Sequence, residues 1–435
     1  MRIRDRPPRY PCPVSDRGAK KKVFVDRFVF FSWWVRWETL VARWPARQRW
    51  SLFGLVLGLG ALARLWAQTL PGNWDFGQWN SVSASALAGL DPYEVNGYNY
   101  TPIWLAILTL FKTLSSDEVS FRLLISFLMI AIDVWIAWML VRRGYALAAY
   151  VFLLSPIAIA ISGHHQQIDG LAVALALAAL LLMGKGTPER ITRIDIQAVL
   201  LLGLSLSVKQ VFLVLPLWLA MRSGSIQRRL LYLFVPPAIF LAMLASAFIP
   251  YSPRAVIDAV LFHDGTNIPP MVLAFIPHQL APWVIENRGG MVLSLLFLMA
   301  AGYLFRRLRP FEAGLAYSIT ALVFAWGVAN QYLVIPMAAV AVFLNIGLLI
   351  WFGLATLYLG GAPDALNLPV LNAIQPHVML NWQWMGRDLF PYLLIGWIIF
   401  VFARDRPGCF MQPSQEAVAR EDAHQEYSPP NPAKV

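Results

Sequence analysis

The chain has 435 residues, of which 58% are hydrophobic and only 14% are charged. A soluble particle of this length needs more polar surface than this composition supplies, so the sequence predicts a polytopic membrane protein. The formal net charge of +11 first suggests a nucleic-acid partner, but most arginines and lysines lie in the N-terminal tail and in alternate loops. That alternation records membrane orientation, and we expect no nucleic-acid partner.

In chain order, the predicted elements form one membrane domain between two polar tails. We expect a cytoplasmic basic tail with an amphipathic interfacial helix over residues 1–50 and a transmembrane domain over residues 51–403. Residues 404–435 form a Pro-rich cytoplasmic tail that is predicted to be disordered. Cys12 and Cys409 fall in these two tails, so no disulfide framework is expected.

Basic loops alternate along the domain with loops rich in Pro, Asn, His and Trp. The positive-inside rule puts the basic loops in the cytoplasm and predicts an all-α protein with about 12 transmembrane segments, within a range of roughly 10 to 13. The runs 196–221 and 331–359 are each too long for one helix, and in both we expect short helices that meet at a polar turn.

The first outer loop, residues 71–120, contains the stretch NWDFGQWNSVSASALAGLDPYEVNGYNYTPIW. Its segment 101–111 is apolar but shorter than the roughly 20 residues that cross a bilayer. We therefore expect an interfacial or re-entrant helix there, followed by a second span near residues 121–141. Asp75 is either the N-cap of a helix or a general base at the boundary between water and membrane.

A second polar cluster, SGHHQQIDGL, covers residues 162–171. His165 and Asp169 are one helical turn apart, so a helix starting here would place both on one face. Adjacent histidines with one carboxylate are a weak metal signature. Recognition of a sugar or phosphate and a satisfied polar turn are the remaining interpretations.

Further polar positions interrupt the apolar runs. Lys209, beside Gln210, either snorkels to the interface, binds an anion such as a ligand phosphate, or pairs with a carboxylate on another helix. Gln331 and Tyr332 lie in an outer turn that is either part of the aromatic belt or a binding surface for hydroxyl groups. Asp133, inside the second span, is expected to brace a neighbouring helix.

The order of these motifs resembles the GT-C superfamily of integral-membrane glycosyltransferases. The resemblance covers about residues 52–345: an outer-loop aspartate, then AGLDPYEVNGYNYTPIW, then H-x-Q-x-D-G-L, then K-Q before an apolar run, then Q-Y. The YNYTP segment is similar to that of GPI-anchor mannosyltransferase I and of bacterial polyprenol-phosphate-mannose-dependent mannosyltransferases. The H-x-Q-x-D-G and K-Q segments look more like those of dolichyl-phosphate-glucose-dependent glucosyltransferases.

The resemblance implies a GT-C-like fold with a catalytic first outer loop. Its outer face would transfer a hexose, with mannose or glucose favoured, from a polyprenyl-phosphate donor to a hydroxyl of a lipid-linked or envelope glycan, with inversion. Asp75 matches the first-loop carboxylate that takes the proton from the acceptor. The residues that would bind the donor phosphate and sugar are His164, His165, Gln167, Asp169, Lys209, Gln210, Gln331 and Tyr332.

The same resemblance assigns support of the loop to Tyr93, Tyr98 and Tyr100. It requires no metal or other cofactor, and its partners are the donor, the acceptor and membrane lipids. The short loops favour a bacterial cytoplasmic membrane, with both termini in the cytoplasm and the active site on the outer face.

The sequence departs from the family pattern at two positions, and two other classes of protein stay open. Trp74 and Phe76 flank Asp75 where several relatives carry a second acidic residue, and Asp169 stands where the glucosyltransferases have asparagine. A secondary transporter would also place ionisable groups at membrane depth, although no internal repeat supports it. A non-enzymatic subunit of an envelope-assembly complex would tolerate loss of both Asp75 and Asp133.

Overall fold

The computed structural model describes residues 32–71, 74–95, 98–183, 191–262, 279–280, 289–325, 329–378 and 385–403. The predicted tails, apart from the stretch that begins at residue 32, lie outside the described residues, as do Cys12 and Cys409. Within the described stretches every regular element is helical, in agreement with the all-α prediction.

The elements up to residue 183 are α2 (Ser32–Ala42), α3 (Ala46–Ala67), α4 (Trp74–Leu87), α5 (Pro92–Val95), α6 (Pro102–Leu114), α7 (Glu118–Arg142), α8 (Ala146–Leu154), α9 (Pro156–Ala158), the π-helix η2 (Ile159–His165) and α10 (Asp169–Leu182). The elements from residue 191 onward are α11 (Arg193–Val208), η3 (Gln210–Phe212), α12 (Leu215–Arg222), α13 (Ile226–Ser246), α14 (Pro253–Leu261), α16 (Gly289–Leu304), α17 (Pro310–Val323), η5 (Asn330–Val334), α18 (Met337–Val342), α19 (Ile346–Gly361), α20 (Pro369–Ile374), η6 (Gln375–Val378) and α21 (Met385–Ala403).

Several of these helices have the length and composition of membrane spans. Among the described residues, α3, α7 and α13 are long and apolar enough to cross a membrane, and α8 with Pro156–His165, a pair bent by 48°, would make a fourth span. Seven further apolar helices have 10–17 residues. These helices support association of the chain with a membrane, while a total of about 12 spans stays a prediction.

Both ambiguous apolar runs are divided into short helices, as predicted. The first run breaks at Lys209, where α11 ends and the 3-10 turn η3 leads into α12. The second breaks at Asn345, which accepts the Leu348 N–H at 3.2 Å and so caps α19. The Asn345 amide also donates to the Gly396 carbonyl at 3.0 Å, which satisfies the polar turn inside the bundle.

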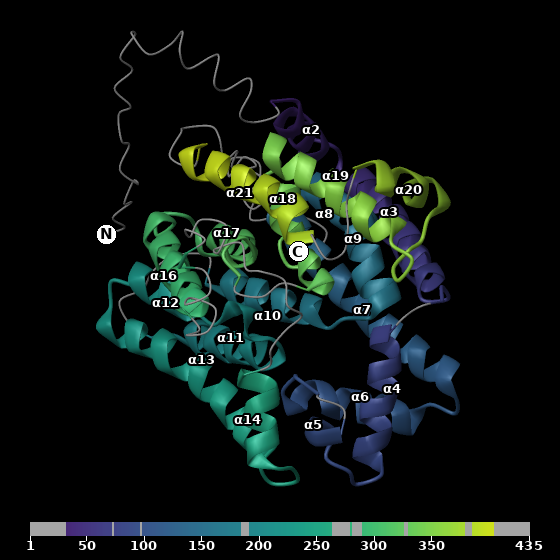
Figure 1. Cartoon of the computed structure of the whole chain (residues 1–435). Coiled ribbons are helices and arrows are strands. Elements are labelled where there is room, and N and C mark those ends of the chain that lie inside the picture. The colour runs from purple at the N-terminus through teal and green to yellow at the C-terminus, as the bar shows by residue number, and fades with distance from the viewer. Residues whose placement is uncertain are drawn as a thin grey trace, which may run out of the picture.

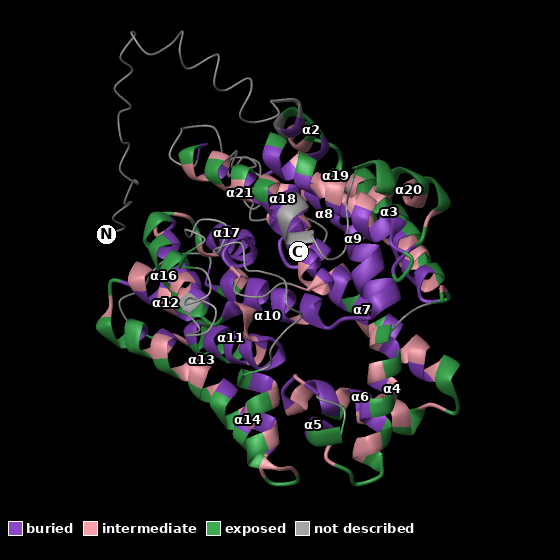
Figure 2. Cartoon of the chain, viewed as in Figure 1, coloured by how far each residue is buried: buried purple, intermediate pink, exposed green. Residues whose placement is uncertain are grey.

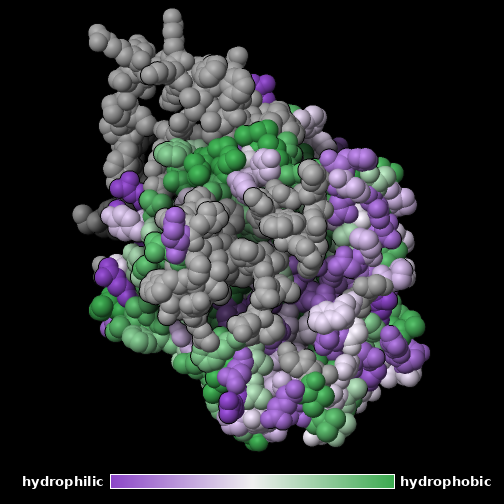
Figure 3. Space-filling view, viewed as in Figure 1, coloured by the Kyte–Doolittle hydropathy of each residue, from purple (hydrophilic) through white to green (hydrophobic). Residues whose placement is uncertain are grey.

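The interior and the lipid-facing exterior are distinguished by burial. Helices α17 and α10 are each buried along nearly all of their length, as expected of helices that are apolar on every side (Figure 2). Helices α13 and α16 expose large apolar side chains such as Phe234 and Leu296. Figure 3 shows apolar residues at the left of this face, where Figure 1 places these two helices. An exposed apolar surface of this kind suits contact with lipid.

A buried ion pair joins the first two long helices. Arg64 of α3 is 1% exposed, and its Nε donates to Asp133 Oδ2 of α7 at 2.8 Å. Arg64 Nη1 also donates to the carbonyls of Gly60 at 2.9 Å and Leu153 at 2.7 Å. These contacts confirm the prediction that Asp133 braces a neighbouring helix, because a charge at this depth needs a partner.

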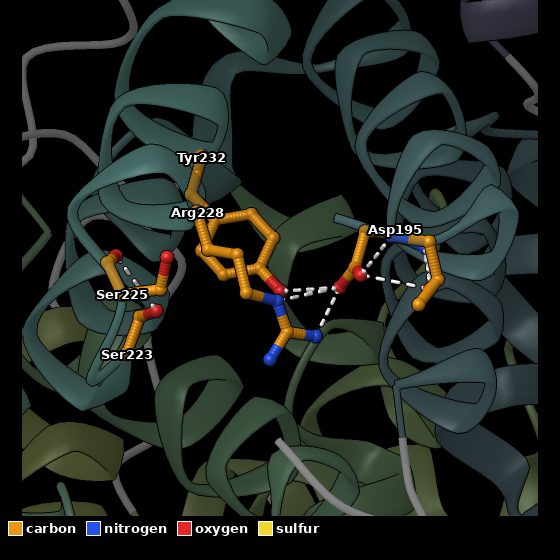
Figure 4. Close-up of polar contacts among 6 residues, drawn as sticks. Asp195, Ser223, Ser225, Arg228 and Tyr232 are labelled. Carbon is orange, nitrogen blue, oxygen red and sulfur yellow. Dashed lines mark hydrogen bonds and ion pairs between the residues drawn. The ribbon is translucent and has the colours of Figure 1, made fainter. Parts of the chain in front are cut away.

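A second buried pair ties α11 to α13 near the first turns of both helices (Figure 4). Asp195 accepts from the Thr192 hydroxyl at 2.8 Å and from the Tyr232 hydroxyl at 2.9 Å, and it forms an ion pair with Arg228. Arg228 and Tyr232 project from the first turns of α13, after the turn that contains Ser225. The pair therefore fixes the register of the two helices near their basic ends.

Helix α2 is docked on the bundle by one carboxylate. The two oxygens of Glu38 accept the backbone N–H groups of Leu147 at 3.1 Å and Ala148 at 3.2 Å, in the first turn of α8. Burial raises the pKa of Glu38 from 4.5 to about 7, against the lowering effect of these hydrogen bonds. The N-cap residue of α8, Tyr145, makes no side-chain cap bond. Glu38 of α2 therefore caps the N-terminus of α8 in its place.

Candidate functional site

The candidate site lies where α3 ends, α7 and α10 begin, and α11 ends. Helices α4, α5 and α6 of the first outer loop lie together at this end with α14, at the bottom of Figure 1. Basic residues lie at the opposite ends of the same long helices: Arg142 ends α7 and Arg193 begins α11. This sidedness is the one that the predicted outer-face position of the site requires, and that position stays a prediction.

The first cluster of the site is a pair formed by Asp75 and His165. Asp75 lies in the first turn of α4, and its Oδ2 is 2.7 Å from His165 Nδ1 at the end of η2. The carboxylate is 15% exposed and the imidazole 5%. His165 Nε2 is buried and has no hydrogen-bond partner among the described residues. An imidazole N–H at Nδ1 fits this geometry, because it donates to Oδ2 and leaves Oδ1 as a free acceptor.

The histidine is positioned by close packing of η2 on α3. Arg64 Nε donates to Ser162 Oγ at 2.9 Å, so the same guanidinium group contacts both Asp133 and the π-helix η2. At Gly163 an added Cβ would lie 2.9 Å from the Arg64 Cα and 3.0 Å from its carbonyl oxygen. Only glycine allows this approach, and π-helical turns are frequent at functional sites.

The second cluster surrounds Lys209, the residue between α11 and η3. Its Nζ donates to the Tyr100 hydroxyl at 3.1 Å and lies 3.5 Å from Asp169 Oδ1. The ammonium also lies 4.3 Å from the ring centre of Tyr100 and 4.9 Å from that of Tyr332. Lys209 is 9% exposed and Asp169 is fully buried, so the lysine does not snorkel; it pairs with a carboxylate on another helix.

Tyr100 connects the first outer loop to this cluster. Its hydroxyl accepts from Lys209 and donates to Gln167 Oε1 at 2.9 Å. Burial raises the pKa of Tyr100, and the nearby Lys209 charge only partly opposes this effect. The hydroxyl therefore keeps its proton and can donate and accept at once. The next residue, Thr101, donates to the Ser207 carbonyl and so fixes the loop to the end of α11.

Three of the predicted binding residues have no described side-chain hydrogen bond to either cluster. The ring nitrogens of His164 face the carbonyls of Ala67 at 3.3 Å and Asp364 at 3.2 Å. Gln210 Nε2 is buried without a hydrogen-bond partner among the described residues. No side-chain hydrogen bond is described for Gln331, whose backbone N–H donates to the Asn330 side chain at 2.9 Å.

The prediction that His165 and Asp169 share one helical face is wrong. The π-helix ends at His165, Gln166 adopts a left-handed φ of 55°, and α10 begins at Asp169. The carbonyl of Gln166 accepts from Trp79 Nε1 at 3.2 Å, which stabilises the break. The break directs His165 toward Asp75 and Asp169 toward Lys209, so the two side chains have different partners.

Sequence reasoning missed Arg64, Ser162, Trp79 and Gln166. A lone arginine within an otherwise apolar span was the available signal for Arg64, because such a charge is paired in most membrane proteins. Nothing in the sequence pattern indicated that Gln166 takes a left-handed conformation, since that conformation is rare for residues other than glycine.

The described residues contain no group of three or more His, Cys, Asp or Glu side chains that could hold a metal ion. No protein-family model, no curated protein and no solved structure matches this chain. The described residues form an all-helical protein with helices that could cross a membrane, and the two clusters are the features that point to an activity.

Proposed function

We propose that the chain is a GT-C-type glycosyltransferase that moves a hexose from a polyprenyl phosphate to an acceptor hydroxyl at the outer face of a bacterial cytoplasmic membrane. The observation that carries the proposal is the position of Asp75: a partly exposed carboxylate that is hydrogen-bonded to buried His165, four residues before Asp169 of the buried Lys209 cluster. The remaining spans and the GT-C-like topology belong to the same proposal.

The Asp75–His165 pair suits a general base. The imidazole N–H engages Oδ2, and no hydrogen bond to Oδ1 is described, so Oδ1 is available to accept the proton of the acceptor hydroxyl. As that proton moves to Oδ1, the acceptor oxygen forms its bond to the anomeric carbon and the bond between that carbon and the phosphate oxygen breaks. One displacement at this carbon inverts its configuration.

The Lys209 cluster suits the leaving group. The departing polyprenyl phosphate takes the bonding electrons and gains charge, which a fixed ammonium stabilises. The contact between Lys209 and Asp169 is 3.5 Å, longer than the roughly 2.7–2.9 Å of a good charge-assisted hydrogen bond. A phosphate oxygen can therefore compete with Asp169 for the ammonium, while Tyr100 keeps the side chain in place.

Purified protein in detergent tests the proposal with a panel of polyprenyl-phosphate sugars, read by release of polyprenyl phosphate and by mass of the product. We expect release from at least one mannosyl or glucosyl donor when an acceptor glycolipid is present. A nucleotide-sugar donor serves as the negative control. Turnover of the nucleotide sugar and of no lipid-linked donor would contradict the proposal.

A secondary transporter is the second candidate, favoured by the helix breaks at Gln166 and Lys209, where charged side chains meet. A carrier that moves protons through Asp133 is disfavoured, because Asp133 already forms a buried ion pair with Arg64. In proteoliposomes, a transporter would move solute across the bilayer without releasing polyprenyl phosphate. That assay separates the two candidates directly.

A further inference from the structure

Asp91 of the first outer loop makes two hydrogen bonds that the proposed chemistry does not use. Its Oδ1 accepts the Tyr93 N–H at 2.9 Å, within the same loop, and its Oδ2 accepts the Ser252 N–H at 2.8 Å. Ser252 lies 161 residues away and is the N-cap of α14, at the corner that follows α13. One carboxylate thus fastens two outer segments that are distant in the sequence.

Four tyrosines, which we call the tyrosine row, continue from this corner toward the site. Ring centres are 5.5 Å apart for Tyr251 and Tyr93, 5.2 Å for Tyr93 and Tyr98, and 5.8 Å for Tyr98 and Tyr100. Tyr93, Tyr98 and Tyr100 are each at most 4% exposed. Because a buried core is close-packed, a displacement at one end of such a row is transmitted to the next ring. The last member of the row holds the Lys209 ammonium.

We infer that Asp91 is a positioning residue: it fastens the first outer loop to the α13–α14 corner and, through the tyrosine row, sets where Tyr100 holds Lys209. Its effect on sugar transfer rests on the proposed function, whereas its effect on Tyr100 does not. Asp91 needs to be a carboxylate because both of its oxygens face N–H donors. An asparagine would turn its own NH₂ group toward one of them.

The test uses 3-fluorotyrosine placed at position 100 and 19F NMR of the full chain in detergent, with donor KM and kcat measured in parallel. We expect Asp91→Ala and Lys209→Met both to shift and broaden the resonance, and Asp91→Asn to have an intermediate effect. Glu94→Gln is the matched control, because Glu94 is an exposed carboxylate of the same loop with no described partner. Its spectrum should equal that of the parent.

A second pair of variants tests the same bond from the other side. Ser252 has φ −61° and ψ 117°, values that proline adopts, so Ser252→Pro removes the N–H donor and the side-chain cap, and its ring carbon Cδ replaces the proton that Asp91 accepts and displaces the carboxylate. Ser252→Ala removes the cap and keeps the N–H. We expect the proline variant to resemble Asp91→Asn in its spectrum and the alanine variant to resemble the parent. The pair keeps the test decisive if Asp91→Ala fails to fold.

For transfer, loss of the Asp91 tie should lower kcat by about tenfold with donor KM changed by less than about threefold, as expected when a contact that strengthens while the phosphate gains charge is displaced. An unchanged Tyr100 resonance in both Asp91→Asn and Ser252→Pro would overturn the inference. A shifted resonance with an unchanged kcat would overturn the positioning role. If these variants shift the resonance but the parent protein turns over no lipid-linked donor, the tie stands and the proposed function is refuted.

Discussion

The Lys209–Asp169 pair gives a prediction in which stability and function separate. Asp169 is fully buried, and its carboxylate makes no hydrogen bond among the described residues, so Lys209 is its main compensation. Replacing Lys209 by methionine leaves this charge uncompensated, which typically costs roughly 3–5 kcal/mol. Unfolding entropy is about 2.1 cal/mol/K per residue, so for a chain of this length the apparent Tm should fall by roughly 3–5 °C.

Removing both charges should reverse the loss of stability. An apolar pair of similar volume often replaces a buried ion pair at no cost, or with a gain of about 1–4 kcal/mol. We therefore expect Lys209→Met with Asp169→Leu to recover the parent Tm. Lys209→Arg keeps the charge and should lose less stability than Lys209→Met, although the longer guanidinium fits the Tyr100 contact poorly.

Polyprenyl-phosphate release distinguishes a structural lysine from one that binds the leaving group. If Lys209 stabilises the phosphate, the double variant recovers its Tm and still releases polyprenyl phosphate at least about 100-fold more slowly than the parent. Differential scanning fluorimetry and the release assay can be run on the same preparation. Recovery of both stability and turnover in the double variant would refute the proposed role of Lys209.

Three further outcomes are expected. Arg64→Met alone should destabilise the chain by roughly 3–5 kcal/mol in thermal unfolding, and adding Asp133→Leu should restore most of that loss. No recovery in the double variant would contradict the role of this ion pair as a brace. Because burial raises the pKa of Glu38 to about 7, the folded state binds this proton more tightly than the unfolded state. Stability should fall as pH rises from about 4.5 to about 7, and Glu38→Gln should flatten that part of the Tm profile. Ala88→Cys should react with an impermeant maleimide from outside intact cells and Ser414→Cys should not; the reverse result would invert the topology.

The helical class and several helix positions could be predicted from the sequence. Long apolar runs separated by basic or polar loops are typical of helices that lie in a membrane. The sequence also placed the breaks at Lys209 and within the run 331–359, since a polar residue inside an apolar run interrupts a span. It could not identify partners across the bundle. The pairing of Asp75 with His165 and of Asp169 with Lys209 depends on the left-handed residue Gln166, which has no sequence signature.

The hydrogen bonds of Asp91 could not be predicted from the sequence either. Both donors are backbone N–H groups, those of Tyr93 and Ser252, and every residue type except proline has such a group. The tyrosines that follow Asp91 stood out only as loop support, because their stacking order depends on how the loop folds back on α14. Arg64 is a lone charge within an apolar stretch of the sequence. Its role depends on the positions of Asp133 and Ser162 in three dimensions, which the sequence does not specify.

The central claim is that Asp75 is the base, and Asp75→Asn tests it most directly. Asparagine can still accept the His165 N–H, so this variant removes the charge and basicity while keeping the side chain in place. Asp117→Asn is the control, because Asp117 is an exposed N-cap of α7 and asparagine caps about as well. With the Tm and donor binding of the parent, Asp75→Asn should release polyprenyl phosphate at least about 100-fold more slowly, whereas Asp117→Asn should match the parent. Near-parental release by Asp75→Asn would contradict the claim.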